Sequence, residues 1–202
     1  MRVLCVPLGP VQANCYVVID QDRALVIDPG DAFPDLEKIL KSNHAKLEAV
    51  LLTHAHFDHI GGLDEMLKTF GVDVYLNPLE FEFLEDARLN GSSAFGGYMT
   101  SKAQPKPLKE GTQNIGGFEV TAMTLPGHTV GSTVLGIGNN LFTGDVLFQG
   151  SVGRTDLATG SWSQMQESIQ ILKKLPDDTV VYPGHGPSTT IGQEKQWNPY
   201  FR

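Results

Sequence analysis

The chain has few of the residues that hold small secreted proteins or membrane proteins together. Two cysteines, Cys5 and Cys15, are too few for a disulfide framework, and we expect both to be reduced, buried thiols. No apolar run approaches the roughly 20 residues that span a bilayer, which excludes a membrane-spanning helix. The N-terminal region has no long apolar stretch and no small-residue cleavage site, so we expect no signal peptide and a cytoplasmic location.

Positive charge is also scarce. The sequence has 15 Lys and Arg against 23 Asp and Glu, a formal net charge of −8. An acidic surface repels phosphate backbones, which argues against nucleic acid as a partner. An apolar fraction of 41% is typical of a globular protein. For about 22 kDa we expect a folded surface of roughly 9,000 Å² and one domain over residues 1–202.

Glycine and proline are abundant instead, with 22 and 12 residues, and predict many turns between short elements. Apolar runs predict strands at 15–19, 24–28, 46–53, 72–76, 118–125, 132–138, 139–145 and 179–184, and helical spacing predicts helices at 33–43, 58–70 and 163–175. In the last helix Met165, Ile169, Ile171 and Leu172 are expected to face inward. Residues 77–111 predict a short helix and a long surface loop, either beside an active site or as a plain connection. Together these elements predict an α/β sandwich with helices outside.

One hexapeptide concentrates residues that bind metals: His54-Ala55-His56-Phe57-Asp58-His59. In an extended segment, residues two apart share a side, so His54 and His56 can point to one metal. Asp58 and His59 lie where the next helix begins, and the turn there lets them face a second metal. Zinc, iron and manganese accept imidazole and carboxylate ligands. Without a metal, these buried groups would need many hydrogen bonds to offset their desolvation.

Three further candidates follow strands elsewhere in the sequence. His128 and His185 each come after a Pro-Gly pair, and Asp145 ends the strand at 139–145, where its carboxylate can bridge two cations. Gly61-Gly62, just after the hexapeptide, is expected to leave room for close backbone approach beside a metal. His44 lies in a polar turn and is expected to be solvated. The result is seven candidate ligands, sufficient for two metals.

The motifs THAHFDHIGG, PGHT, GD and PGHG, in this order, resemble the metallo-β-lactamase superfamily over nearly the whole chain. The resemblance implies an αββα sandwich, with two mixed sheets flanked by helices and the metals at one edge. It also implies a first metal on His54, His56 and His128, a second on Asp58, His59 and His185, and Asp145 as the bridge. The lactamases themselves often lack an Asp-His pair and carry a cysteine ligand. The two cysteines lie far from the motifs in sequence, which disfavours lactam hydrolysis.

The stretches GDVLFQGSVGRTDLATGS and YPGHGPSTTIGQEKQWNPY are similar to the glyoxalase II branch, the hydroxyacylglutathione hydrolases. In that branch a basic residue nine positions after the bridging aspartate binds a glutathione carboxylate. Here that position is Arg154, which can instead form a structural ion pair with Asp156 or another acid. Two tyrosines of the branch that contact glutathione correspond to Asp156 and Pro187. The sequence also stops at Arg202, so we expect a short form without the C-terminal helical domain.

The resemblance implies a binuclear hydrolase that cleaves S-2-hydroxyacylglutathione-type thioesters. Two divalent ions, Zn²⁺ first with Fe or Mn as alternatives, would share a hydroxide that attacks the thioester carbonyl, and Asp58 would orient it or take its proton. The expected partner is a small-molecule thioester, and a monomer is compatible with the sequence. The alternative is a persulfide dioxygenase with one iron on His54, His128 and Asp145. A lactonase, a nuclease or a non-catalytic metal-binding module rank lower.

Overall fold

The strand Ala13–Asp20 (β2) is buried on both faces, with Asp20 as its one exposed residue. In the computed structural model, which describes residues 1–201, this strand lies inside a four-layer molecule. Val17 faces the helices that cover the sheet, whereas Val18, next in sequence, faces a second sheet. A strand covered from both sides has no solvated face, which is why the run lacks a polar alternation. The folded surface is 9317 Å², near the expected value.

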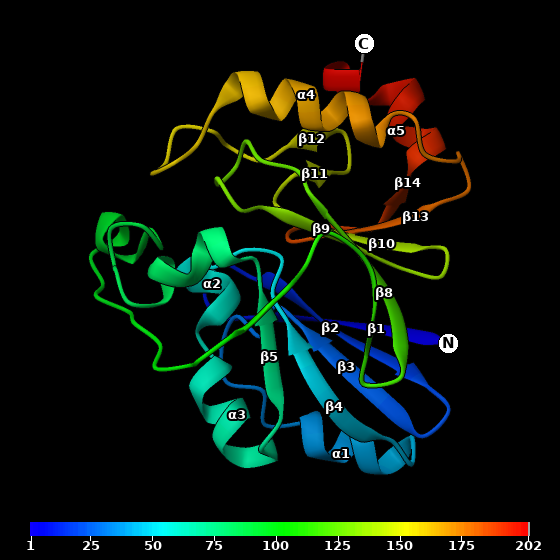
Figure 1. Cartoon of the computed structure of the whole chain (residues 1–202). Coiled ribbons are helices and arrows are strands. Elements are labelled where there is room, and N and C mark those ends of the chain that lie inside the picture. The colour runs from blue at the N-terminus through cyan, green and yellow to red at the C-terminus, as the bar shows by residue number, and fades with distance from the viewer. Residues whose placement is uncertain (202) are drawn as a thin grey trace.

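The first sheet comes from the N-terminal half of the chain and lies in the lower half of Figure 1. In spatial order its strands are β1 (Arg2–Leu8), β2, β3 (Arg23–Ile27), β4 (Lys46–Leu51), β5 (Asp73–Leu76) and β6 (Lys106–Pro107). Strands β1 to β3 pair antiparallel, and β3 to β6 pair parallel. Parallel pairing brings the carboxyl ends of β3 and β4 to the same edge.

The second sheet comes from the C-terminal half and is also mixed. In spatial order its strands are β14 (Thr189–Thr190), β13 (Val180–Pro183), β10 (Asn140–Gly144), β9 (Thr133–Ile137), β8 (Phe118–Thr124) and β7 (Gly111–Ile115). Only β10 and β13 pair parallel, so their carboxyl ends also share an edge. A short ribbon joins β11 (Leu147–Phe148) to β12 (Ser151–Val152).

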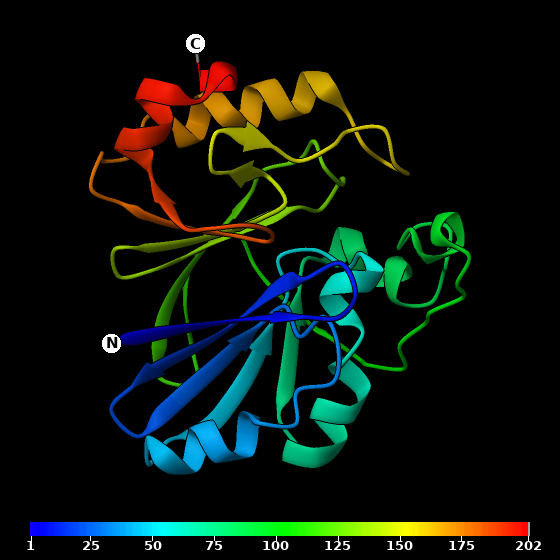
Figure 2. The same cartoon turned by 180° about the vertical axis from the view of Figure 1, so that it is seen from behind.

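Helices cover the outer face of each sheet, as both views show (Figures 1 and 2). They are α1 (Leu36–Ser42), α2 (Phe57–Ile60), α3 (Leu63–Phe70), α4 (Trp162–Leu172) and α5 (Ile191–Trp197), with 3₁₀ turns η1 (Pro78–Leu84), η2 (Ser92–Phe95) and η3 (Pro199–Phe201). Leu40 of α1 and Met66 of α3 pack on the first sheet, and Met165 and Ile191 pack on the second. The expected αββα sandwich is confirmed.

Several expected elements differ in detail. The expected helix at 58–70 is two helices, because the chain turns at Gly61-Gly62. The expected helix at 33–43 begins only at Leu36, since a turn that closes with the Leu36 N–H on the Phe33 carbonyl (3.2 Å) comes first. The expectation for Ile171 was wrong: its side chain is 44% exposed, whereas Met165, Ile169 and Leu172 are buried. Strand β7 and helix α5 were not predicted at all.

The expectation for the cysteines was half right. Cys15 is buried, but Cys5 is exposed because β1 is the edge strand of its sheet. His44 is exposed, as expected. Residues 77–111 hold η1, η2 and β6 joined by irregular segments. Within residues 1–201, the structure contains no helix with the length and apolar character needed to cross a membrane.

Candidate metal centre

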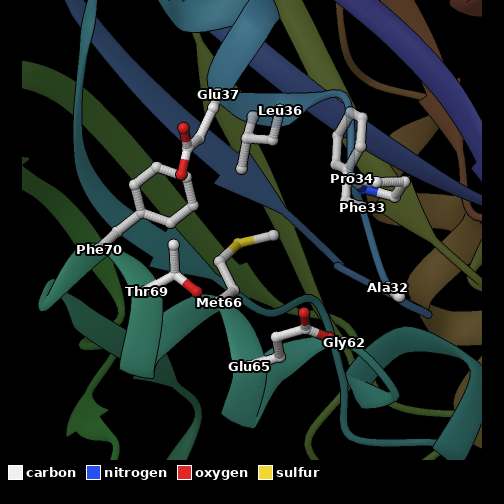
Figure 3. Close-up of a pocket in the computed structure, with 10 residues that line it drawn as sticks. All are labelled: Ala32, Phe33, Pro34, Leu36, Glu37, Gly62, Glu65, Met66, Thr69 and Phe70. Carbon is white, nitrogen blue, oxygen red and sulfur yellow. The ribbon is translucent and has the colours of Figure 1, made fainter.

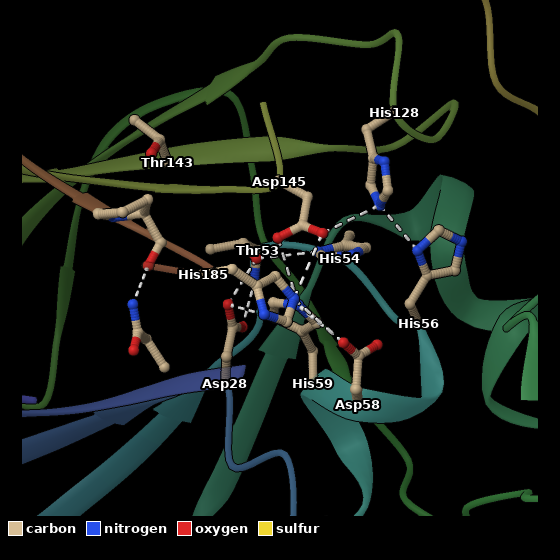
Figure 4. Close-up of polar contacts among 12 residues, drawn as sticks. Asp28, Thr53, His54, His56, Asp58, His59, His128, Thr143, Asp145 and His185 are labelled. Carbon is tan, nitrogen blue, oxygen red and sulfur yellow. Dashed lines mark hydrogen bonds and ion pairs between the residues drawn. The ribbon is translucent and has the colours of Figure 1, made fainter. Parts of the chain in front are cut away.

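The seven candidate ligands come together at one edge of the sandwich, between the two sheets (Figure 4). Each lies just beyond the end of a strand or at the start of a helix. His54 and His56 follow β4, and Asp58 and His59 lie in α2. His128 follows β8, Asp145 follows β10, and His185 follows β13. Every strand that carries a ligand therefore ends at the same edge, so residues up to 131 positions apart share one site.

The ligands fall into overlapping groups, in each of which one ligand atom per residue lies within 4.8 Å of the others. These groups are His54-His56-His128, His54-His59-Asp145 and Asp58-His59-His185. The first and third are the two sets that the family resemblance implied. Asp145 lies between them, because Oδ1 is 3.4 Å from His59 Nε2 while Oδ2 is 3.5 Å from His128 Nε2.

Asp28 orients two of the imidazoles from behind. Its Oδ2 is 3.0 Å from His59 Nδ1 and accepts a hydrogen bond of 2.6 Å from the Thr53 hydroxyl. Because the Thr53 hydroxyl donates its one proton to Asp28, it can only accept from His54 Nδ1, which lies 3.1 Å away and is therefore the donor. Both imidazoles therefore carry the proton on Nδ1 and present Nε2 to the cluster. Sequence reasoning missed Asp28, because its partners Thr53 and His59 lie 25 and 31 residues away.

Backbone oxygens and buried side chains fix the remaining ligands. His128 Nδ1 donates to the Arg154 carbonyl at 2.8 Å, which turns its Nε2 toward Asp145. The loop before His185 is tied to the first sheet by Asn14, whose Nδ2 donates to the Pro183 carbonyl at 3.0 Å. Sequence reasoning missed Asn14 too, because its partners lie about 170 residues away, at separations of 169 and 172.

Glu80 in η1 joins the two loops that carry the first ligand set. Its side chain is fully buried. One carboxylate oxygen accepts from the Ala55 N–H at 3.1 Å, and the other accepts from the Gly131 N–H at 2.9 Å. Ala55 lies between His54 and His56, and Gly131 follows His128 by three residues. Sequence reasoning placed Glu80 in the region expected to form a short helix and a surface loop at 77–111, and missed this role.

Burial and neighbouring charges shift the pKa values of His54 and His56 in the opposite direction from those of His59 and His185. Burial lowers the pKa of His54 well below the usual value and that of His56 to about 3. Burial acts on His59 in the same sense, but the carboxylates of Asp58, Asp145 and Asp28 outweigh it and raise its pKa. The pKa of His185 is also raised, because its hydrogen bond to Asp58 and the charge of Asp145 outweigh burial.

The cluster has the buried, unpaired atoms that a cation would satisfy. Within residues 1–201, four buried side-chain atoms have no hydrogen-bond partner, and all belong to candidate ligands: His54 Nε2, His56 Nε2, His59 Nε2 and Asp145 Oδ1. Three of them belong to residues whose free atom faces the cluster, whereas His56 presents Nδ1, 2.8 Å from His128 Nε2, and its Nε2 points away (Figure 4). Leaving such groups unpaired costs about 1–3 kcal/mol each. Imidazole nitrogen and carboxylate oxygen are the donors that Zn²⁺ and Fe accept, so these residues fit divalent metals.

The glycines near the cluster allow close approach of neighbouring groups. A side chain at Gly61 would collide with the Gly30 carbonyl, and one at Gly62 with the Asp31 carbonyl, so these two glycines allow α2 and α3 to pack on the loop after β3. The expected close backbone approach is confirmed, and the backbone approached is this loop. Gly184 lies beside the ligands, where a Cβ would meet Asp145 Oδ1 and lie 2.8 Å from His59 Cε1.

A cavity of about 310 Å³ opens over the cluster. His56, Asp58, His128, Asp145 and His185 form its floor. Residues from 90–95 form part of its wall, so the segment at 77–111 borders the site. Arg154 also lines it, but its Nε and Nη2 pair with the two oxygens of Asp156 at 2.7 and 2.9 Å. The structure therefore forms the ion pair that the sequence left open for Arg154.

A second cavity of about 310 Å³ lies between α1 and α3, on the outer face of the first sheet (Figure 3). Phe33, Met66 and Phe70 line it together with the acidic Glu37 and Glu65. Its lining contains no histidine and no cysteine, so the candidate chemistry belongs to the cavity over the metal cluster.

Comparison with known protein families agrees with the order of the motifs, the αββα layers and the His/Asp cluster at the sheet edge. A family model described as "Metallo-beta-lactamase superfamily" matches residues 8–185. The chain belongs to the metallo-β-lactamase superfamily. Superfamily members bind divalent metals through a His/Asp cluster, and this chain has residues of that kind grouped closely enough to hold a metal ion.

Relatives and solved structures within the superfamily cover almost the whole chain. The "Probable metallo-hydrolase YqgX" of Bacillus subtilis (strain 168) is 40% identical over 200 residues, 96% of this chain and 95% of that one. The "Hydroxyacylglutathione hydrolase GloC" of Haemophilus influenzae is 34% identical over 210 residues, 100% of this chain and 98% of that one. The BLEG-1 B3 metallo-β-lactamase superposes with a TM-score of 0.93 at 42% identity, covering 99% of each chain. TTHA1623 in a di-iron-bound form gives 0.86 at 39% identity, covering 98% of this chain and 99% of that one.

Proposed function

We propose that the protein is a binuclear metal-dependent thioesterase that acts on 2-hydroxyacyl thioesters of the glyoxalase II type. The observation that carries this proposal is the pair of three-residue ligand sets, with Asp145 between them, on the floor of one open cavity. The similarity to a hydroxyacylglutathione hydrolase over the whole chain supports it.

The ligand sets would hold two divalent ions, His54-His56-His128 the first and Asp58-His59-His185 the second, with Asp145 shared. Zn²⁺ suits these donors, and a relative that binds two irons makes iron the alternative. Such ions lower the pKa of a bound water toward neutrality and polarise a carbonyl oxygen. The reaction then needs no serine or cysteine nucleophile.

Asp58 is the residue of the chain that is placed to handle a proton. Its Oδ2 is 3.2 Å from His185 Nε2, and it lines the cavity. Burial would raise its pKa, but His59 and His185 outweigh burial and lower it, so the carboxylate is ionised at neutral pH. Asp58 Oδ1 can therefore accept a proton from the attacking water. The thiol of the product has a pKa of about 8.5, so the sulfur can leave as a thiolate and needs no proton beforehand.

The test is hydrolysis of S-lactoylglutathione and of a simple lactoyl thioester by protein whose metal content has been measured. We expect turnover with about two metals per chain. His59→Ala should lose the second metal and most turnover, because one nitrogen ligand disappears. His44→Ala is the matched control, since His44 is exposed and outside the site, and it should keep both. Undiminished turnover by His59→Ala would overturn the proposal.

Lactam hydrolysis is a second candidate, favoured by one observation, the 42% identity to a protein described as a B3 metallo-β-lactamase. A β-lactam in the same panel separates the two, because lactamase activity without thioester hydrolysis would replace the proposed function.

A further inference from the structure

Apolar side chains from five separate segments meet on the wall of the cavity over the metal site. They are Val11 between β1 and β2, Phe57 in α2, Phe95 in η2, Phe148 in β11 and Leu157 before α4. Val11 is 42% exposed and Phe95 is 59% exposed, so both show apolar surface to solvent. Exposed apolar residues that gather around a concave site mark a place where a ligand binds.

The aromatic rings on this wall form two pairs. The ring centroids of Phe57 and Phe95 are 5.2 Å apart. On the other side of the opening, the Phe148 ring lies edge-on to the His185 imidazole, with centroids 6.1 Å apart. The apolar surface therefore begins next to the candidate metal ligands and extends to the mouth of the cavity.

Two polar side chains on the wall, Asn90 and Arg154, make hydrogen bonds within the protein. Asn90 donates its amide hydrogens to the carbonyls of Phe83 (3.0 Å) and Met99 (2.8 Å). Within residues 1–201, Arg154 is the only lysine or arginine that lines the cavity, and Asp156 holds its guanidinium through two hydrogen bonds. A ligand carboxylate that binds the edge of the guanidinium formed by Nε and Nη2 would have to displace Asp156.

This wall does not suit glutathione, which carries two carboxylates and an ammonium group. Such a thiol needs free cationic donors, and its charged groups would lie against phenylalanine side chains and lose hydration. An uncharged apolar group would instead bury surface on the same side chains.

We propose that the site recognises its substrate through an uncharged apolar group on the thiol, which packs on the wall formed by Val11, Phe57, Phe95, Phe148 and Leu157. This inference rests on the proposed thioester hydrolysis and names the class of thioester: esters of apolar thiols rather than of glutathione. Arg154 then serves the fold, since its carbonyl orients His128 while its side chain pairs with Asp156.

The experiment compares three lactoyl thioesters that differ only in the thiol: glutathione, N-acetylcysteamine and benzyl mercaptan. With metal-loaded protein, we expect kcat/KM to be about tenfold higher for the benzyl ester than for the N-acetylcysteamine ester, the benefit of roughly 1.4 kcal/mol from packing a ring. The glutathione ester should be the poorest of the three.

Three variants test whether the wall causes this preference among the thiols. Phe95→Ala should reduce the benzyl-to-N-acetylcysteamine ratio of kcat/KM about fivefold, because it removes an aromatic partner. Tyr98→Ala, three residues away, is 88% exposed and outside the cavity lining, and it should leave that ratio unchanged. Asp156→Asn releases Arg154 and should raise kcat/KM for the glutathione ester while the benzyl ester keeps its rate.

The outcomes separate this inference from the proposed function. If the glutathione ester is preferred, or if all three esters are hydrolysed equally, the apolar wall does not select the substrate and the inference is overturned while the thioesterase stands. If protein carrying both metals hydrolyses none of the three, thioester hydrolysis itself is refuted.

Discussion

Asp28 is a buried carboxylate that accepts three hydrogen bonds at once, from the Thr53 N–H, the Thr53 hydroxyl and His59 Nδ1. Through them it fixes the orientation of one imidazole in each ligand set. We expect Asp28→Asn to weaken metal binding about 10- to 100-fold, because an amide offers one acceptor where three donors converge and turns an N–H toward one of them. Titration of metal-free protein with Zn²⁺ measures the change.

The matched control for Asp28→Asn is Asp35→Asn. Asp35 is exposed at the start of α1, where its side chain makes no capping hydrogen bond. This variant should bind metal like the parent protein. Equal affinity in both variants would show that the imidazoles are oriented without Asp28.

The two ligand sets should release metal at different pH values. A ligand imidazole must be neutral, so a raised pKa means that a proton competes with the metal as the pH falls. The pKa values of His59 and His185 are raised, whereas the pKa of His54 is well below its usual value and that of His56 is about 3. The metal on Asp58-His59-His185 should therefore be lost first on acidification, with affinity falling about tenfold per pH unit for each proton taken up.

Metal content after dialysis over a series of pH values tests this order. We expect a first step from two metals to one, then a second step at lower pH. Loss of both metals in a single step would contradict the opposite pKa shifts of the histidines in the two sets.

The seven candidate ligands could be predicted because their signal is local. Four lie within six residues, and three follow glycine at the end of an apolar strand. Asp28 and Asn14 could not, because each acts through partners 25 to 172 residues away and sequence spacing does not show such contacts. The exposure of Cys5 depends likewise on β1 being an edge strand, which only the sheet order decides.

At the scale of elements, local chemistry contained signals that apolar spacing alone did not use. Helix α5 begins at Thr190, whose hydroxyl accepts from the Gln193 N–H at 3.2 Å. Thr-x-x-Gln at this place is a known start signal for helices. The break between α2 and α3 at Gly61-Gly62 is different, because it depends on packing against the loop after β3, which the sequence of the helix itself does not show.

The 3₁₀ turn η1 links two ligand-bearing loops through Glu80. We expect Glu80→Ala to destabilise the protein by about 1–3 kcal/mol for each of the two buried N–H groups that it leaves unpaired. It should also weaken the metal on His54, His56 and His128 more than the other metal, because both loops that carry this set lose their common anchor. Thermal unfolding and metal titration measure the two effects.

Glu82→Ala is the control within the same element, since Glu82 is exposed. Its unfolding temperature and metal affinity should equal those of the parent protein. Glu80→Gln retains one acceptor and should fall between Glu80→Ala and the parent. If Glu80→Ala loses stability but binds both metals normally, Glu80 has no part in holding the metal site.

At the scale of the whole molecule, the layers could be predicted, but the order in which the strands pair within each sheet could not. Strands buried on both faces require cover on both sides, which is enough to expect sheets flanked by helices. The chain supplies one sheet from each half, and the two halves meet at the ligand cluster. The net charge of −8 counts Asp58 and Asp145 as free acids, whereas two divalent ions on this cluster would bring the loaded protein nearer to about −4.

Because each half of the chain contributes ligands, metal should hold the two sheets together. His54, His56, Asp58 and His59 come from the first half, and His128, Asp145 and His185 come from the second. Removing the metals leaves buried nitrogens and a carboxylate oxygen unpaired across that junction. At a metal concentration about a thousandfold above Kd, the lost binding energy is about 4 kcal/mol for each metal, which for a chain of this size lowers Tm by roughly 8–16 °C per metal. Calorimetry before and after chelation, with metal content measured in both samples, gives the shift in Tm.

His44→Ala should show the same shift in Tm as the parent, whereas His59→Ala, which has already lost one metal, should show a smaller one. An unchanged Tm after complete removal would mean that packing between the sheets, and not the metal, joins the halves.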